Sequence, residues 1–578
     1  MGAHNVTIAA VFDEIADLLE IQGANPFRVR AYRNAARTLG DLGTDVSDFL
    51  QRGMPLTDIP GIGEDLAHKI REILDTGGCE LLRRLQREIP AGVGRLLKVP
   101  GLGPKRVRKL WHDLNIQSVE QLMQAAQAQH IRELPGFGEK TEHKILEALQ
   151  RFSGERRVKL AVAAQLGEAL ASHLHNTPGV ERVEIAGSYR RMRETVGDLD
   201  IVVVAQDNTM VMDKLAHYDD VQEIAASGTT RATVILHSGL QVDVRVVQRE
   251  SLGAALVYFT GSKAHNIVIR RLAQERGLKI NEYGVFRDDE KVAGETEESV
   301  YAAIGLPWIA PELREDRGEI EAAARGELPE LIELRDLHGD LHAHSKASDG
   351  HDSIEEMAQA ARKFGLEYLA ITDHSRKLTI AHGLDAVRLA KQCAEIDALN
   401  ARMDGITLLK GIEVDILDDG ELDLPDAVLA GLDVVVAAVH SRFGLPRGKQ
   451  TARILRALDN PHVNILAHPV GRLIGEREAY DLDMLKIMRK ARQRGVALEL
   501  NAHPRRLDLT DVHCRMARDE GIWIAIGSDA HSQFEFDMLG FGIGQARRGW
   551  LARDNVINAR TLAQLRPLLR RGRRRSRA

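Results

Sequence analysis

The sequence has few cysteines and no long apolar run. Its cysteines, Cys79, Cys393 and Cys514, are an odd number and lie far apart, which excludes a disulfide framework and a cysteine metal cluster. No stretch approaches the ~20 apolar residues that a membrane helix needs, so no membrane partner is expected. The first residues carry acids within their apolar stretch and no basic leader, which favours a cytoplasmic protein over a secreted one.

The chain also lacks an overall basic charge. Its formal net charge is -6, but phosphate contact depends on where cations cluster rather than on their sum. The alternative to phosphate binding is that these clusters are ordinary solvated surface charges, particularly in the tail. The basic clusters comprise Arg28, Arg30, Arg33, Lys105, Arg106, Arg108, Lys109 and the tail at residues 569–578.

At 578 residues the chain is too long for one hydrophobic core, so several domains are expected. Residues 1 to about 150 have helical periodicity and contain one pattern three times, at 59–70, 99–110 and 134–145. Each copy is Pro-Gly-apolar-Gly followed by a helix, which permits a tight turn and presents free N–H groups to an anion. The pattern resembles the helix-hairpin-helix of repair and replication proteins, which grips the DNA backbone without reading sequence. The candidate DNA-binding residues are Gly61, Gly63, Gly101, Gly103, Gly136 and Gly138.

From about 155 to 250 the pattern changes to strands. Asp198 and Asp200 are one residue apart on a predicted strand, so their side chains share a face, and Asp243 comes from another strand. Three converging carboxylates suit a pair of Mg²⁺ ions that activate a 3′-hydroxyl and stabilise leaving pyrophosphate. Upstream, the small turn at Gly187 and Ser188, with Arg191 and Arg193, suits triphosphate oxygens.

Residues 1 to about 310 resemble a family X DNA polymerase, on the motifs GSYRR, GDLDI, VDVR, YFTGSKAHN and LKINEYGVF. By that resemblance Asp198, Asp200 and Asp243 are the catalytic metal ligands, and Arg245 is a palm residue that switches with nucleotide binding. The nucleotide-binding residues implied are Gly187, Ser188, Arg191, Tyr258, Phe259, Gly261 and Asn266.

The resemblance also places Lys69 at the position of a Schiff-base lysine that removes a 5′-deoxyribose phosphate, with Arg28 and Tyr32 in the same pocket. Asp65 stands where the family has a supporting lysine. A plain phosphate contact by Lys69 is therefore the favoured interpretation, and lyase activity the alternative.

Histidines are concentrated in the last part of the chain, with twelve of the 22 between His338 and His531. They follow strand-like segments that alternate with helices, which predicts an α/β barrel or wound sheet. In a barrel the strand ends meet on one rim, so these side chains are expected to converge. Imidazoles with carboxylates suit Mn²⁺, Zn²⁺ or Fe²⁺, and two or three ions bridged by Glu413 would suit phosphoester hydrolysis. The candidate ligands are His342, His344, His374, Glu413, His440, His468, Asp529 and His531.

This region resembles the polymerase and histidinol phosphatase (PHP) domain, by the motifs HAH, TDH, GIE, VHS, AHP and SDAH. The resemblance adds Asp349 as a ligand and implies a distorted seven-strand barrel holding Mn²⁺ or Zn²⁺. His503 and Arg505 are candidate phosphate contacts, with ordinary surface roles as the alternative.

The combined prediction is a multi-domain chain: a helical lyase-like domain at 1–85, a helical DNA-binding subdomain at 86–152, an α+β nucleotidyltransferase palm at 153–249, a nucleotide-selection subdomain at 250–315, a linker with one surface helix at 316–333, and a PHP phosphoesterase at 334–578. The resemblance implies a bacterial monomer that fills short gaps in DNA from dNTPs during base excision repair. Its PHP domain would act as a Mn²⁺-dependent 3′–5′ exonuclease, with abasic-site cleavage as a further activity. The alternatives are a PHP domain that hydrolyses small phosphate monoesters, and a DNA-end-binding scaffold.

Overall fold

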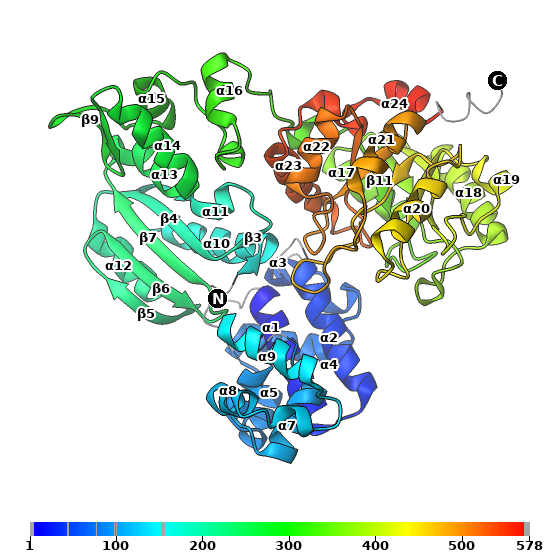
Figure 1. Ribbon diagram of the computed structural model, residues 1–578, viewed down its shortest axis with the longest axis horizontal. Helices are drawn as coiled ribbons and strands as arrows, with labels where there is room; N and C mark the ends of the chain where they lie inside the picture. The colour runs from blue at the N-terminus through cyan, green and yellow to red at the C-terminus, as the bar shows by residue number, and fades with distance from the viewer. Residues whose placement is uncertain are drawn as a thin grey trace. The chain divides into compact units, whose positions relative to one another are not determined.

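The computed structural model describes residues 5–42, 46–51, 53–76, 78–97, 99, 101–151 and 157–570 (Figure 1). Most of the basic tail, residues 571–578, lies outside this part of the chain. The chain forms two compact units. The first contains residues 1–158, 164–177 and 209–243, and the second contains residues 159–163, 178–208 and 244–578. None of the described helices combines the length and the apolar character needed to cross a membrane.

The N-terminal part is helical, as the periodicity predicts. The three Pro-Gly-apolar-Gly turns lead directly into α4, α7 and α9, and the first glycine of each turn has a positive φ, of 73° at Gly61, 87° at Gly101 and 92° at Gly136. Only glycine adopts such backbone angles without strain. The helices are α1(Asn5–Gln22), α2(Pro26–Asp41), α3(Val46–Gln51), α4(Glu64–Thr76), α5(Glu80–Glu88), α6(Ala91–Leu96), α7(Pro104–Leu114), α8(Val119–Gln127) and α9(Glu139–Arg151).

The central part contains a five-stranded sheet with the strand order β2-β4-β7-β6-β5. Strand β4 alternates an exposed Asp198 and a half-buried Asp200 with buried Leu199 and Ile201, so the two carboxylates share the accessible face. The strands are β2(Val180–Ile185), β4(Asp198–Ala205), β5(Val221–Ser227), β6(Arg231–Leu236) and β7(Gln241–Val247), and the helices of this part are α10(Leu160–His175), α11(Gly187–Arg190) and α12(Asn208–Ala216).

The next part packs helices against a small antiparallel sheet, β8(Lys279–Asn281), β9(Gly284–Arg287) and β10(Glu290–Ala293). Its helices are α13(Leu252–Thr260), α14(Lys263–Gln274), α15(Glu297–Ala303) and α16(Glu319–Arg325). The surface helix predicted at 316–333 is wrong in its burial: α16 exists, but Ile320, Ala322 and Ala323 join the core. Its Glu319 is fully buried and bonds His265 Nδ1 at 2.7 Å. The prediction missed this apolar face because the residues on either side of it in the sequence are charged.

The C-terminal part is a seven-stranded parallel sheet in which the strands neighbour one another in chain order. A parallel bridge between Ala343 and Ala530 links its first and last edges, so the sheet is a nearly closed barrel. Alternate strand residues divide between two apolar clusters: Leu369 and Ile371 pack against the helices, and Tyr368 and Ala370 fill the interior. The strands are β11(Gly339–Ala343), β12(Tyr368–Ile371), β13(Thr407–Asp415), β14(Val434–Ala438), β15(Ile465–Leu466), β16(Ala497–Asn501) and β17(Ile524–Gly527).

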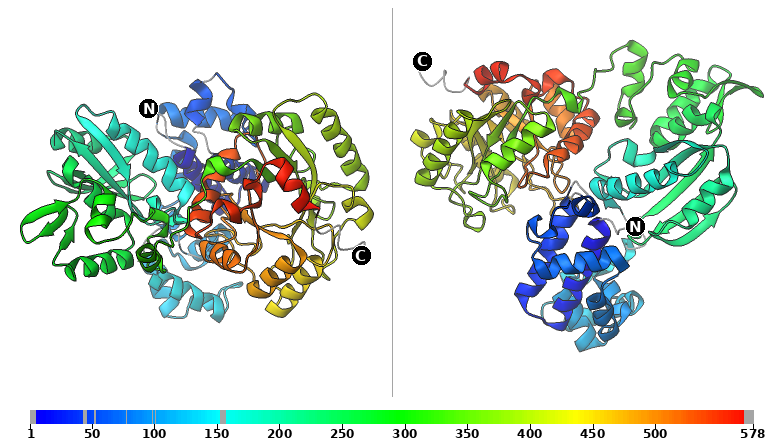
Figure 2. Two further views of the ribbon diagram at one scale, coloured as in Figure 1. Left: turned by 90° about the horizontal axis from the view of Figure 1, so that it is seen from above. Right: turned by 180° about the vertical axis from the view of Figure 1, so that it is seen from behind.

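Helices surround this barrel, and α24 closes one end, where Leu565 and Leu569 complete the interior cluster. Figure 2 shows these helices from two further sides, coloured from green to red. They are α17(Ile354–Phe364), α18(Ala386–Asn400), α19(Asp426–Leu429), α20(Arg447–Ala457), α21(Met484–Arg494), α22(Asp511–Asp519), α23(Leu539–Arg548) and α24(Leu562–Leu569). The predicted fold class is therefore confirmed: a helical N-terminal region with three glycine hairpins, an α+β palm and a seven-strand barrel.

Candidate active sites

The turn after β2, residues 187–194, contains the short helix α11 and combines a glycine with a buried hydroxyl that has no hydrogen-bond partner among the described residues. Gly187 has φ +64°, and a Cβ there would lie 2.6 Å from Asp200 Oδ2. Any other residue would therefore displace that carboxylate. Ser188 Oγ is buried without a hydrogen-bond partner in the described part of the chain. A buried hydroxyl without a partner costs free energy, so a polar group from outside the protein that bonded Ser188 would be stabilised here.

The acids of the predicted triad lie on strands that neighbour each other in the sheet. Asp198 and Asp200 begin β4, and Asp243 lies on β7, next to β4 in the strand order. Two hydrogen bonds fix the Asp243 carboxylate, which accepts from Thr233 Oγ1 at 2.6 Å and from Gln241 Nε2 at 2.7 Å.

The residues predicted to line the nucleotide pocket follow on α13 and α14. Tyr258 and Phe259 form an edge-on ring pair with centroids 5.0 Å apart, and the Arg245 guanidinium lies 4.4 Å from the Phe259 ring centroid. Asn266 Nδ2 donates to Tyr258 O at 2.7 Å. A Cβ on Gly261 would lie 2.6 Å from Asn266 Oδ1 and 3.2 Å from Val257 O. A larger residue between α13 and α14 would therefore displace the Asn266 side chain.

The histidines of the barrel converge at the carboxyl ends of its strands. Glu413 is central: its Oε2 lies 2.7 Å from His374 Nδ1, and its Oε1 lies 3.2 Å from His440 Nε2 and 3.0 Å from His468 Nε2. Asp529 Oδ1 lies 3.1 Å from His344 Nε2. This is the convergence that the strand-end pattern predicts.

Three groups of side chains have the spacing of metal ligands. One contains His344, Asp349, His374 and His531, the second His342, His344 and Asp529, and the third His374, Glu413 and His440, and in each the ligand atoms all lie within 4.8 Å of one another. His344 and His374 each belong to two groups. Shared ligands of this kind are typical of clustered ions.

The electrostatics of the cluster also favour cations. Burial alone would lower the pKa of His374, but Glu413 and Asp349 outweigh it and raise the pKa to about 10. His342 Nε2 and His344 Nδ1 are buried and have no hydrogen-bond partner among the described residues. Metal ions would replace protons in such a cluster, because ligand imidazoles bind in their neutral form. The side chains present therefore fit a metal centre.

Sequence reasoning missed the groups that orient these side chains. Glu499 Oε1 lies 2.5 Å from His342 Nδ1, and Asp415 Oδ1 lies 3.1 Å from His440 Nδ1. Such carboxylates fix the tautomer and ring orientation of a metal-binding histidine. Arg506 was also missed, and its Nε lies 3.4 Å from Asp529 Oδ2. One signal was available in the sequence: Glu499 stands between the two leucines of β16, and Asp415 ends β13 two residues after the predicted ligand Glu413.

The two candidate phosphate contacts differ in their surroundings. Burial lowers the pKa of His503 to about 3, so its ring is neutral at physiological pH. Arg505 pairs with Glu476, with Nε 3.1 Å from Oε1, and Lys159 Nζ lies 2.7 Å from that same oxygen. Arg505 is thus engaged in an ion-pair network.

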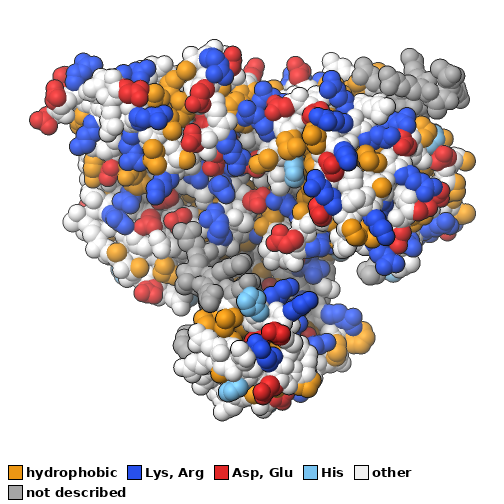
Figure 3. All heavy atoms as spheres, in the orientation of Figure 1, with side chains coloured by type: hydrophobic (Ala, Val, Ile, Leu, Met, Phe, Trp, Pro, Cys, Tyr) orange, Lys and Arg blue, Asp and Glu red, His pale blue; other side chains and the backbone are white. Residues whose placement is uncertain are grey.

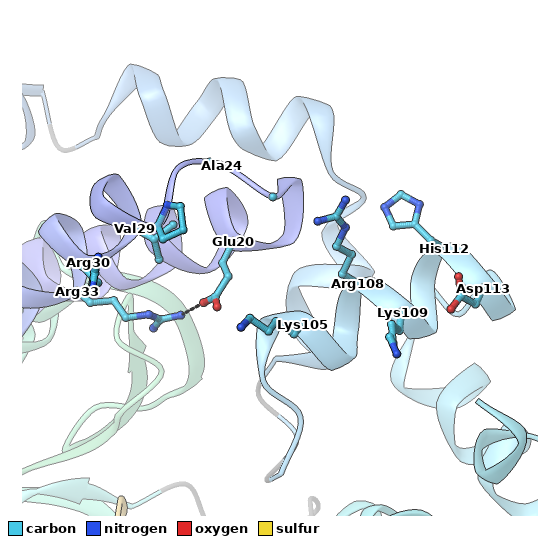
Figure 4. A pocket seen from close by; sticks show the side chains of 12 residues that line it. Glu20, Ala24, Val29, Arg30, Arg33, Lys105, Arg108, Lys109, His112 and Asp113 are labelled. Carbon is cyan, nitrogen blue, oxygen red and sulfur yellow. Dashed lines mark hydrogen bonds and ion pairs between the residues drawn. The ribbon is translucent and has the colours of Figure 1, made fainter. Parts of the chain in front are cut away.

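Basic side chains of the helical region surround a cavity of about 1000 Å³ (Figure 4). Lys105, Arg108, Lys109 and His112 line it from α7. Arg30 and Arg33 line the opposite side, where Arg33 is neutralised by Asp17 at 2.5 Å and Glu20 at 3.0 Å. On the face of the molecule shown in Figure 3, cations and acids are otherwise interspersed.

The hairpin glycines leave room for a ligand. A Cβ built on Gly63, Gly101, Gly103 or Gly138 would meet nothing within 4 Å. The second glycine of each turn is therefore not required by packing within the described structure. Space beside a helix N-terminus is what a phosphate needs for close approach.

Comparison with known proteins matches four family models along the chain. They are the helix-hairpin-helix domain at residues 3–79, the SAM-like helix-hairpin-helix tandem at 93–151, the DNA polymerase beta thumb at 255–315 and the PHP domain at 340–503. A solved Leishmania infantum polymerase beta ternary complex is 21% identical and covers 38% of this chain and 96% of its own, with a TM-score of 0.27.

Among curated proteins, several probable phosphatases match less than half of this chain. One from Thermoanaerobacter sp. (strain X514) is 30% identical over 38% of this chain and 89% of its own, and one from Syntrophotalea carbinolica is 31% identical over 39% and 92%. The DNA polymerase/3′-5′ exonuclease PolX of Bacillus subtilis (strain 168) is 41% identical over 573 residues, which are 98% of this chain and 100% of that protein. The chain therefore belongs to the bacterial PolX family, the family X DNA polymerases and 3′–5′ exonucleases that carry a C-terminal PHP domain.

Proposed function

We propose that this chain fills short gaps in DNA during base excision repair, with Asp198, Asp200 and Asp243 as its polymerase metal ligands. The observation that carries the proposal is the pairing of two carboxylates on one face of β4 with a turn whose Ser188 hydroxyl has no partner among the described residues. Mg²⁺ bound by the three acids would activate the primer 3′-hydroxyl and stabilise leaving pyrophosphate.

The residues of the chain itself orient the nucleotide. Gly187 lets the turn approach Asp200, so that Ser188 and Arg191 meet the triphosphate beside the acids. Tyr258 and Phe259 offer ring faces to the sugar, and Asn266 is oriented toward the base by its bond to Tyr258 O. Holding the reactants in place in this way supplies much of the rate enhancement of phosphoryl transfer.

We propose further that the barrel removes blocked or mismatched 3′-ends and cleaves abasic sites, with Mn²⁺ held by the histidine cluster. The ligands proposed are those of the three groups above together with His468. Mn²⁺ or Zn²⁺ bound there would supply hydroxide at neutral pH and neutralise the attacked phosphate. Glu499 and Asp415 fix the ring orientations of His342 and His440. Arg506 adds a cation beside Asp529.

DNA binding is assigned to the helical region. The three glycine hairpins leave open space at their N–H groups, and the cations of α7 line a cavity nearby in the same unit. Contacts of this kind bind the sugar-phosphate backbone of a gap or nick without reading its sequence. The protein is expected to work as a monomer.

A second candidate function, hydrolysis of small phosphate monoesters by the barrel, is favoured by the similarity of 38% and 39% of this chain to probable phosphatases and by the PHP domain match at residues 340–503. The two are separated by substrate. If Mn²⁺-loaded protein hydrolyses a small phosphate monoester while a 3′-labelled primer stays intact, the exonuclease proposal is wrong.

Crossed variants test the two sites. Asp198→Asn with Asp200→Asn should abolish extension on a one-nucleotide gap and keep Mn²⁺-dependent digestion of a 3′-labelled primer. His342→Ala with His344→Ala should give the reverse pattern. Loss of both activities in either variant would contradict the assignment of one chemistry to each site.

A further inference from the structure

The turn that carries the proposed triphosphate residues is packed directly against helix α23 of the barrel. Met192 lies in this turn, and Gly544 lies on α23. A Cβ on Gly544 would lie 2.3 Å from Met192 Cε and 3.0 Å from Met192 Cβ. Only glycine allows the helix to approach the turn this closely.

A buried arginine on the same helix bonds the turn. Arg548, whose side chain is 3% exposed, donates through Nη1 to Arg191 O at 2.7 Å and to Glu315 Oε1 at 2.8 Å. Its Nη2 donates to Asp511 Oδ2 at 2.8 Å. One guanidinium therefore joins the barrel, the segment after α15 and the polymerase turn.

Glu315 is the point where these charges meet. Arg191 Nε lies 3.1 Å from Glu315 Oε1, and Arg193 Nη1 lies 3.5 Å from its Oε2. Arg191 also donates through Nη1 to Thr260 O at 2.6 Å, next to the Gly261 bend of the nucleotide pocket. Three guanidiniums thus share one carboxylate that is only 9% exposed.

This arrangement determines how firmly Arg191 is held. Burial would raise the pKa of Glu315, but Arg548 and then Arg191 outweigh it and lower the pKa, so the carboxylate is ionised at neutral pH. If Arg548 were absent, Glu315 would be balanced by Arg191 and Arg193 alone. Its full attraction would then compete with a triphosphate for Arg191.

We infer that Arg548 is a positioning residue for nucleotide binding, so that the barrel domain tunes the polymerase site by neutralising Glu315, which otherwise competes with the triphosphate for Arg191. This inference rests on the proposed role of Arg191 at the triphosphate. A second link at the other end of the turn, Arg472 Nη2 to Glu194 Oε2 at 2.7 Å, keeps the two parts together when Arg548 is replaced.

The test compares Arg548→Met with Arg547→Met in the full-length protein. Arg547 is a matched control, because it is the neighbouring residue and pairs with Glu312 at 2.6 Å instead of with the turn. Single-nucleotide gap filling with varied dNTP should show a KM for dNTP raised on the order of ten-fold in Arg548→Met, with kcat changed much less. Arg547→Met should keep the KM of the unmodified protein.

Removing the carboxylate should undo the effect. Arg548→Met with Glu315→Gln is expected to return the KM for dNTP toward that of the unmodified protein, because no buried anion then competes for Arg191. Mn²⁺-dependent digestion of a 3′-labelled primer should persist in every variant, which reports an intact barrel.

Two results would overturn the inference. One is a KM for dNTP in Arg548→Met that equals that of Arg547→Met. The other is a double variant as impaired as the single one, which would indicate general damage. If Arg548→Met does not fold, the single variant Glu315→Gln is the test. The inference requires that its KM for dNTP does not exceed that of the unmodified protein, and a higher KM contradicts it. An unmodified protein that fills no gap would instead contradict the proposed function.

Discussion

At the scale of the residue, the neighbouring Asp65 affects the protonation of the Lys69 amine. Its Nζ contacts the Asp65 carboxylate. Burial would lower the pKa of Lys69, but the hydrogen bond to Asp65 and the nearby Tyr32 outweigh it and raise that pKa. A lysine forms a Schiff base only as the neutral amine. We therefore propose that Lys69 stays protonated at neutral pH and acts as a phosphate contact.

Borohydride reduces a Schiff base and so traps the protein covalently on DNA that carries a 5′-deoxyribose phosphate. We predict that Asp65→Ala increases the amount of protein trapped in this way. Removing the carboxylate lowers the pKa of Lys69 and raises its neutral fraction. Because the Asp65 side chain is 78% exposed, solvent screening limits the gain to about two- to three-fold. Glu64→Ala, which removes a neighbouring acid, is the control, and Lys69→Ala should abolish trapping. Equal trapping by Asp65→Ala and the unmodified protein would contradict this account.

Individual residues of the histidine cluster show which ligands could be predicted from the sequence and which could not. His342 and Glu413 were predicted as ligands because histidines and acids recur at the ends of successive strand-like segments, and the structure brings these two side chains together. Glu499 was not predicted, because its role depends on a contact with a residue 157 positions away. Spacing along one strand carries no information about such a contact.

At the scale of the element, the start of α15 is organised around one buried acid. Thr296 caps the helix, and Glu297, at its first position, is 6% exposed. Its carboxylate accepts from Arg190 at 2.8 Å and 2.9 Å, from Arg314 at 2.7 Å and from Trp308 at 3.0 Å. Burial would raise the pKa of Glu297, but these partners, Arg314 first, lower it to about 2.

We predict that Glu297→Gln lowers the free energy of unfolding by about 3 kcal/mol at pH 7. The pKa is lower in the folded state, so this stabilisation is complete above the unfolded value near 4.5 and is lost as pH falls toward 2. Urea unfolding should accordingly show a smaller difference between variant and unmodified protein at pH 3 than at pH 7. Glu298→Gln, on the exposed side of the same turn, should have little effect. A difference that grows with acidity would contradict the mechanism.

Elements differ in how well the sequence specifies them. The glycine hairpins and the strands that carry the acids follow from local turn chemistry and from alternation, so they were predicted. Strand β5 was not, because its residues are almost all exposed and show no alternation. The helix α16 was predicted with the wrong burial, because its short apolar face packs on residues distant in sequence.

At the scale of the whole molecule, ligands of different chemistry are assigned to different parts of the chain. The hairpins and the basic cavity lie among α1 to α9, which have buried residues of their own such as Phe12 and Leu110. The histidine cluster lies in the barrel, whose core is separate. A ligand that binds only the folded state stabilises the cooperative unit that holds it. Metal and DNA should therefore act on different unfolding transitions.

We predict two transitions in scanning calorimetry. Saturating Mn²⁺ should raise the transition of the barrel by several degrees, because a ligand at about 100 times its Kd adds about 2.7 kcal/mol of stability. Gapped DNA in metal-free buffer should raise the transition of the helical region instead. His342→Ala with His344→Ala should cancel the Mn²⁺ shift and leave the DNA shift, since those histidines lie in the barrel cluster. Mn²⁺ that moved both transitions equally in this variant would act outside the cluster, and the metal site would then be assigned wrongly.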